Sequence, residues 1–507
     1  MTSQLTDQTI TFDGRAFING ERVHARDGQT FDCLSPVDGR LLTPVARGSA
    51  ADIDAAVAAG RAAFEDRRWC GMAPAQRKRV MIKFADQLLA HADELALTET
   101  LDMGKPVKYA KGVDVNSAAN CIRWYGEAVD KVYDEIAPTP SNSLALITRE
   151  PVGVVGIIVP WNYPMIMAAW KIAPALAAGN SVVLKPSEKS PLTALRLAEL
   201  ALAAGIPPGV FNVVPGFGTE AGSPLALHMD VDCIAFTGST RVGKQIHVMA
   251  GQSNLKRAWT ELGGKSPNIV FADCPDLDKA VEAAVGSIFF NQGESCNAPS
   301  RLFVEASIKE AFLEKALKLV PQYQPGNPLE KATVMGAIVD KVQMDNVLRY
   351  IGLGKSEGAK LLAGGEAAMP VAGGRRALLG TNPMAAAFPR RQAAPALARF
   401  AVDPGQYEAW RSHRQQAARA QTLPSQLAFV QIEGVPSERV ARLREMAREQ
   451  ALRPSGRAHP PTSGPWSARP PTSGPPPPRR RRPASAHSRC RSGRSWSAGS
   501  RRVRRSD

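Results

Sequence analysis

Cysteine is scarce in this chain and is not arranged in pairs. The 507 residues include seven cysteines, an odd number, and the sequence contains no Cys-x-x-Cys pair. Disulfide frameworks and zinc sites both need grouped cysteines, so the spacing argues against either. Isolated cysteines are typical of a reducing compartment, and we therefore predict a cytoplasmic location and no metal site.

Long apolar runs are also absent. No window reaches the roughly 18 apolar residues that a membrane-spanning helix needs. The segment from Met1 to Gln4 lacks the basic and apolar regions that begin a signal peptide. We therefore expect a soluble protein with no membrane partner.

Lys360 is the last lysine in the sequence. The whole chain carries 63 Lys+Arg against 47 Asp+Glu, a net charge of +16. All 26 basic residues beyond position 370 are arginines, however, while the first 370 residues carry a net charge of −3. This abrupt change indicates two segments of different origin. The Arg-rich tail offers only Trp466 and Trp496 for base stacking and no recognisable module, so we do not expect a nucleic-acid partner.

Short β-branched runs alternate with Ala- and Leu-rich helical stretches from Val152 onward. This alternation is typical of a doubly wound parallel sheet, whose ligands bind beyond the carboxyl ends of the strands. Upstream, Ser49 followed three residues later by Asp52 predicts a capping box at a helix start. The predicted strands are 152–159, 181–184, 210–214, 233–236 and 267–271, and the predicted helices lie near 164–178, 191–204, 219–228 and 240–250. A second α/β unit is expected from a helix at 276–290, a strand at 301–304 and a helix at 306–320.

Five polar clusters contain the candidate functional residues of the sequence. They are PWNYP at 160–164, KPSE at 185–188, FTGST at 236–240, ELGGK at 261–265 and NQGESCN at 291–297. In this order and within this β-α frame, they resemble the aldehyde dehydrogenase superfamily over residues 18–366. Residues 145–160 and 268–277 are most similar to the γ-glutamyl-γ-aminobutyraldehyde and aminoaldehyde branch, so the resemblance implies an ω-amino or γ-glutamylamino aldehyde as the small-molecule substrate.

The resemblance implies an α/β fold with a doubly wound parallel-sheet NAD-binding domain and an incomplete α/β catalytic domain. We expect an N-terminal helical segment and NAD-binding domain at 1–261 and a truncated catalytic domain at 262–366. An unrelated, partly helical segment would follow at 367–452, with one or two Arg-rich amphipathic helices within 397–450, for instance at 436–452. The Arg-, Pro- and Ser-rich composition of 453–507 predicts a disordered tail.

Three residues are the catalytic candidates by resemblance. Cys296 would be the nucleophile, because a thiolate both attacks a carbonyl and leaves again. Asn162, with the backbone N–H of Cys296, would stabilise the oxyanion, and Glu261 would activate the water that hydrolyses the thioester. Taken alone, each residue has a simpler interpretation: an inert buried cysteine, a turn asparagine and a solvated glutamate.

The cofactor implied by the resemblance is NAD. The stretch from Gly238 to Gly243 opens a helix after a strand, so that backbone N–H groups can meet a pyrophosphate. Lys185 and Glu188 are assigned to the adenosine ribose, and the Glu188 carboxylate should repel the 2′-phosphate of NADP. A solvated charge pair is the alternative for these two residues. The full set of cofactor candidates is Ile158, Trp161, Lys185, Glu188, Gly218, Gly238, Ser239 and Leu262.

The resemblance stops after Gly365. The family's Glu-Ile-Phe-Gly-Pro motif and its terminal, subunit-joining strand have no counterpart in the sequence. A homo-oligomer is expected from the family, but the strand that would join its subunits is missing. Two functions therefore remain open: an NAD-dependent aldehyde dehydrogenase, or an inactive truncated or chimeric remnant that retains at most NAD binding.

Overall fold

A computed structural model describes residues 10–364 and five short strands beyond them. These residues lie in one compact unit, Met1–Ala447; a second unit, Arg448–Asp507, lies outside the described residues. The predicted helix at 436–452 and the predicted disordered tail lie outside the described residues. The five strands are β14 (Ala368–Met369), β15 (Leu379–Gly380), β16 (Ala385–Ala387), β17 (Phe429–Gln431) and β18 (Glu433–Val435).

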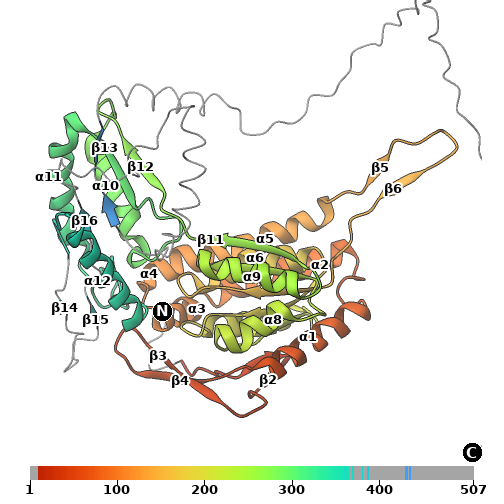
Figure 1. The fold of residues 1–507 in the computed structure, drawn as a ribbon. Coiled ribbons are helices and arrows are strands. Elements are labelled where there is room, and N and C mark those ends of the chain that lie inside the picture. The colour runs from red at the N-terminus through yellow and green to blue at the C-terminus, as the bar shows by residue number, and fades with distance from the viewer. Residues whose placement is uncertain are drawn as a thin grey trace, which may run out of the picture. The chain divides into compact units, whose positions relative to one another are not determined.

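A seven-stranded sheet forms the centre of the larger domain (Figure 1). Its strand order is β11-β10-β7-β8-β9-β1-β2, and the first five of these strands run parallel. The strands are β11 (Arg257–Leu262), β10 (Cys233–Gly238), β7 (Val154–Ile158), β8 (Ser181–Lys185), β9 (Phe211–Val213), β1 (Ala16–Ile18) and β2 (Glu21–Val23). The predicted parallel sheet is thus confirmed, whereas the two antiparallel strands β1 and β2, which extend the sheet beyond β9, were not predicted.

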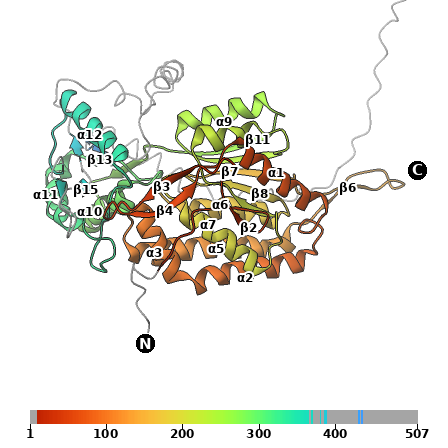
Figure 2. The ribbon, with the colours of Figure 1, turned by 90° about the horizontal axis from the view of Figure 1, so that it is seen from below.

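Helices cover both faces of this sheet (Figure 2). One face packs against α2 (Pro74–Ala90), α5 (Asn116–Ala128), α6 (Pro164–Ala177) and α7 (Leu192–Ala204). The other face packs against α1 (Ala50–Glu65), α8 (Ser223–Leu227) and α9 (Thr240–Gln252). Helix α1 begins as predicted, because the Asp52 carboxylate accepts hydrogen bonds from both the backbone N–H and the hydroxyl of Ser49.

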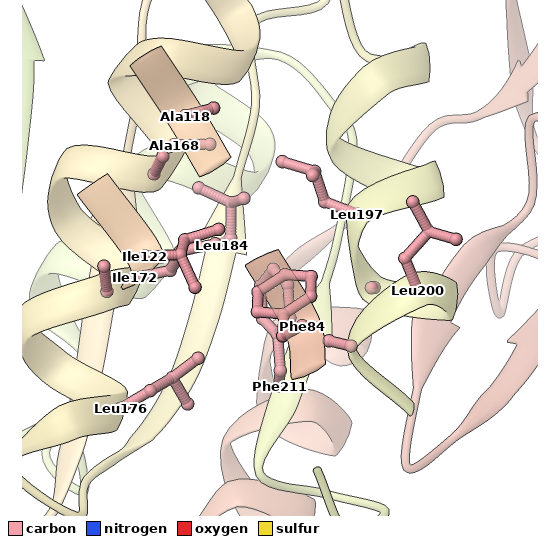
Figure 3. Close-up of a cluster of buried hydrophobic side chains, with 14 of the residues drawn as sticks. Phe84, Ala118, Ile122, Ala168, Ile172, Leu176, Leu184, Leu197, Leu200 and Phe211 are labelled. Atoms are coloured by element: carbon pink, nitrogen blue, oxygen red, sulfur yellow. The ribbon is translucent and has the colours of Figure 1, made fainter. Parts of the chain in front are cut away.

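The core follows from the two-residue period of the central strands. Val155 and Ile157 of β7 belong to the cluster beneath α6, while Val154 and Ile158 belong to the cluster beneath α1. Successive side chains of a strand point to opposite faces, so an unbroken apolar run fills both cores. Figure 3 shows the first cluster, in which Phe84 of α2 lies among side chains from α5, α6, α7 and the sheet.

A smaller sheet has the parallel order β12-β13-β18. It contains β12 (Pro267–Val270), β13 (Arg301–Glu305) and β18, and α10 (Leu277–Phe289) and α11 (Lys309–Leu319) pack beside it. The run at 267–271 therefore forms a strand as predicted, but in this second sheet. Within 397–450, where one or two helices are predicted, residues 429–431 and 433–435 form the strands β17 and β18 instead.

The other described elements connect or flank these layers. They are β3 (Thr30–Leu34), β4 (Leu41–Ala46), α3 (Ala92–Met103), α4 (Val107–Tyr109), η1 (Ala110–Val115), η2 (Val129–Lys131), β5 (Glu135–Ala137), β6 (Ala145–Ile147), η3 (Gly218–Gly222), η4 (Phe290–Gly293), η5 (Ala306–Ile308), η6 (Val320–Tyr323) and α12 (Lys341–Ser356). Strands β5 and β6 form a two-stranded hairpin that exposes Ile136 and Leu146 (Figure 1). Among the described helices, none combines the length and the apolar character needed to cross a bilayer.

Candidate active site and nucleotide site

The loop that carries Cys296 has a strained backbone at its start. Asn291, Gln292 and Gly293 are consecutive residues with positive φ (53°, 56° and 75°), and the first two are not glycines. Their side chains are buried and hold the loop: the Asn291 amide donates to the Asn162 carbonyl (2.9 Å), and the Gln292 amide donates to the Ala337 carbonyl (3.3 Å). Such strain persists only where the surroundings impose it and is frequent at active sites.

Asn162 lies against this loop. It follows strand β7, is only 2% exposed, and its side-chain Nδ2 donates to the carbonyl of Glu294 at 2.6 Å. The Asn162 turn and the Cys296 loop are therefore joined by hydrogen bonds in both directions. Because a side-chain amide has two N–H donors, one remains for a ligand, and the predicted oxyanion role stays a prediction.

Cys296 is partly buried and adjoins the loop that follows Glu261. The Cys296 carbonyl accepts a hydrogen bond from the Gly264 N–H at 3.3 Å. Burial lowers the pKa of Lys171 of α6, and electrostatic interactions with Glu261 and Cys296 oppose that shift. Glu261 itself is exposed on the edge strand β11. The fold thus brings Cys296, Glu261 and Asn162 into one region, from the strand β11 and from two separate loops.

Sequence reasoning missed the buried carboxyl of Glu294. Burial raises its pKa well above the usual value, and the Val339 N–H, 3.4 Å from Oε1, opposes this only weakly. Lys171, Asn291 and Gln292 were also not singled out as functional residues. The sequence pattern that could have identified Asn291 and Gln292 is a polar pair between an apolar helix and a glycine. Lys171 has no such local pattern, because only the tertiary structure brings it to the site.

On the nucleotide side, Lys185 and Glu188 form an ion pair, with 3.5 Å between Nζ and Oε2. Burial lowers the pKa of Lys185, and Glu188 opposes the shift. Ile158 and Lys185 converge on Gly222, where an added Cβ would lie 3.7 Å from Ile158 Cδ1 and 3.8 Å from Lys185 Cδ. The pair is therefore not a solvated surface pair, because its lysine is buried beside apolar groups.

The next three candidates lie at the ends of β10 and β11 and at the start of α9. Gly238 pairs with Leu262 across the β10–β11 ladder, and the exposed Ser239 caps α9 by accepting the Val242 N–H at 3.3 Å. An added Cβ on Gly243 would stand 2.5 Å from Leu262 Cδ2, so this glycine permits close packing of the helix on the strand. The first turn of α9 thus follows the carboxyl end of a parallel strand, and its backbone N–H groups can bind an anion there.

Gly218 and Trp161 complete the predicted nucleotide set. An added Cβ at Gly218 would meet no atom within 4 Å, so the space beside it is open. The Trp161 carbonyl accepts the Ser190 hydroxyl at 3.1 Å, and Lys189 Nζ lies 5.6 Å from the Trp161 ring centroid. A buried lysine with a carboxylate, a capped helix start and open space at a glycine fit a dinucleotide with a ribose diol and a pyrophosphate.

Comparisons with known proteins agree with this arrangement. Residues 23–377 match the aldehyde dehydrogenase family. The chain is 52% identical to the NADP/NAD-dependent aldehyde dehydrogenase PuuC of Escherichia coli over 377 residues, which cover 74% of this chain and 76% of PuuC. Two solved structures, each 50% identical, cover 86% of this chain and 82% of their own. They are γ-glutamyl-γ-aminobutyraldehyde dehydrogenase from Burkholderia cenocepacia (TM-score 0.75) and indole-3-acetaldehyde dehydrogenase AldA from Pseudomonas syringae, bound to NAD+ and IAA (TM-score 0.76).

The chain belongs to the aldehyde dehydrogenase family. The predicted enzyme class and α/β fold are confirmed, and the prediction of NAD agrees with the NAD+ complex of a relative at 50% identity. The roles of the individual site residues, the domain boundaries and the truncation remain predictions.

Proposed function

We propose that this chain oxidises an ω-amino or γ-glutamylamino aldehyde to the carboxylic acid, with NAD as the oxidant. The observation that carries the proposal is the position of the Cys296 loop. It is hydrogen-bonded to the Asn162 turn on one side and to Gly264, just after Glu261, on the other. A nucleophile, an amide donor and a carboxylate base are the groups that a two-step oxidation through a thioester requires.

In the first half of the reaction, the Cys296 sulfur attacks the aldehyde carbon. A C–S bond forms, and the carbonyl π electrons move to the oxygen. The developing oxyanion is stabilised by the Asn162 amide and by the backbone N–H of Cys296. The site formed by Lys185, Glu188 and the first turn of α9 would hold NAD, which would supply the hydride acceptor, and the substrate would remain attached to Cys296 as a thioester.

In the second half, Glu261 takes a proton from a water molecule that attacks the thioester carbon. The C–S bond breaks, the acid is released and the thiolate is regenerated. The exposure of Glu261 on β11 suits this step, because the base must reach water. Lys171, which interacts electrostatically with both Glu261 and Cys296, helps to balance their negative charge.

Glu188 supports a preference for NAD over NADP. Its carboxylate lies 3.5 Å from the Lys185 ammonium, so a 2′-phosphate placed there would meet the negative charge of Glu188. PuuC is described as NADP/NAD-dependent at 52% identity, so both cofactors belong in the assay. A Glu188→Gln variant should improve the use of NADP relative to NAD.

The Burkholderia relative is a γ-glutamyl-γ-aminobutyraldehyde dehydrogenase, and this similarity supports the proposed substrate class. The indole-3-acetaldehyde enzyme is equally similar in sequence, so overall identity does not discriminate between the two aldehydes. A panel must therefore include γ-aminobutyraldehyde, a γ-glutamylated aminoaldehyde and indole-3-acetaldehyde. Higher kcat/KM for the first two is expected, and a clear preference for the indole aldehyde would contradict the proposed substrate.

The test is NADH formation by the purified full chain, with Cys296→Ala as the control. Aldehyde-dependent NADH that the substitution abolishes would support the proposal. NAD binding by calorimetry without turnover would instead support the alternative, a chain that retains the nucleotide site but not the activity. A cytoplasmic location and a homo-oligomer are part of the same proposal and can be tested by fractionation and by light scattering.

A further inference from the structure

A buried ionic cluster lies beside the residue that follows Asn162. The ammonium group of Lys105 lies 2.6 Å from an Asp114 oxygen and 3.4 Å from a Glu99 oxygen, and all three residues are at most 1% exposed. The same ammonium stands 4.3 Å from the ring centroid of Tyr163. Burying such a cluster is costly, and neither step of the proposed reaction uses it.

The Tyr163 side chain lies between this cluster and the loop that carries Cys296. Its hydroxyl lies 2.5 Å from the Ser295 hydroxyl, and both residues are more than nine-tenths buried. Tyr163 directly follows Asn162, and Ser295 directly precedes Cys296. The contact therefore joins the neighbour of the predicted oxyanion donor to the neighbour of the predicted nucleophile.

This contact differs from the other links between the same two segments. The Asn162–Glu294 and Asn291–Asn162 hydrogen bonds each end on a backbone carbonyl. The Tyr163–Ser295 hydrogen bond joins two side chains, so substitution can remove it while Asn162, Asn291 and Cys296 stay in place. Because Lys105 interacts with the ring face, Tyr163→Phe would keep the cation–π contact and lose only the hydroxyl.

We propose that Tyr163, braced by Lys105, is a positioning residue that holds Cys296 through the hydroxyl of Ser295. The Lys105 cluster fixes the ring, the ring fixes Ser295, and Ser295 fixes the backbone N–H and the sulfur of the next residue. The inference rests on the proposed function for its kinetic consequences. A hydrogen bond that sets the geometry of the attacking sulfur should act on kcat.

The test compares Tyr163→Phe, Ser295→Ala and the double variant with the wild type. Losing one neutral hydrogen bond should lower kcat about 3- to 10-fold with little change in KM. The double variant should be no slower than the slower single variant, because both substitutions remove the same contact. Tyr125→Phe is the matched control, since no described residue hydrogen-bonds to the Tyr125 hydroxyl. An unchanged kcat in both single variants, or multiplicative losses in the double variant, would overturn the inference.

A second measurement separates this inference from the proposed function. Iodoacetamide alkylation of Cys296, followed by mass spectrometry, needs neither aldehyde nor turnover. A shifted loop would change the position and surroundings of the Cys296 sulfur, so its alkylation rate should change in all three variants without additivity. If the wild type turns over no aldehyde, this pattern still supports the positioning role, while equal alkylation rates in all four proteins would refute it.

Discussion

Asp102 should make the stability of this protein fall as the pH rises, and Asp102→Asn should remove that dependence. The Asp102 carboxyl is 0% exposed. It accepts hydrogen bonds from the Cys33 thiol (3.1 Å) and the Leu192 N–H (2.8 Å). Burial raises its pKa from 3.8 to about 7, against the opposing effect of these donors. The folded chain therefore keeps a proton that the unfolded chain releases.

The direction of the effect follows from proton linkage. Between pH 3.8 and about 7 the folded state binds one more proton at Asp102 than the unfolded state, so stability is highest below this window and falls through it. At about 1.36 kcal/mol per pH unit, the free energy of unfolding should drop by about 2.5 kcal/mol between about pH 5 and about pH 8 because of this residue alone.

Urea unfolding followed by tryptophan fluorescence would measure this loss at the two pH values. Asparagine keeps the shape of the side chain and can still accept the Leu192 N–H, so the variant should fold. Its unfolding free energy should lose about 2.5 kcal/mol less than that of the wild type over the same pH interval. Parallel pH dependences in the two proteins would refute the reasoning.

Three further outcomes follow from the structure. Glu261→Gln should slow thioester hydrolysis more than acylation, so a burst of NADH equal to the enzyme concentration should precede a slow steady state; equal losses in both phases would contradict a role as the base. Phe84→Ala should cost about 3–5 kcal/mol in urea unfolding, because the buried ring fills the cluster in Figure 3; a loss below about 1 kcal/mol would mean that the site collapses. Gly104→Ala should lower the melting temperature, because Gly104 has φ +87° and an added Cβ would lie 2.5 Å from the Ala337 carbonyl oxygen; an unchanged transition would contradict this.

Local sequence patterns predicted much of the NAD-domain architecture. Apolar runs at 154–158 and 182–184 indicate strands buried between two helical layers, and the Ser49–Asp52 pair fixes where α1 begins. Strand 267–270 was predicted correctly as a strand, but its sheet was not. Periodicity is a property of one segment, whereas sheet membership depends on which other segment supplies the hydrogen-bonding partner.

The candidate site was predicted through residue identity rather than through geometry. Cys296, Glu261 and Asn162 were found because their motifs resemble a family. Tyr163 lay inside one of those motifs, but its contact with Ser295 joins residues 132 positions apart in the chain. Lys171 sits in a helix that otherwise reads as an ordinary apolar stretch. No local pattern encodes such contacts, because they depend on how separate loops pack.

The sequence by itself determined the alternation of strands and helices, the change of composition after Lys360 and the residue types available for thioester chemistry. These are local properties, set by side-chain volume, polarity and backbone preference. The tertiary structure alone decided that Lys105 is buried among carboxylates beneath Tyr163, that Asn291 and Gln292 adopt left-handed conformations, and that β18 joins β13. Each of these depends on the desolvation or hydrogen bonding that a distant segment provides, and those energies arise only when the chain is folded.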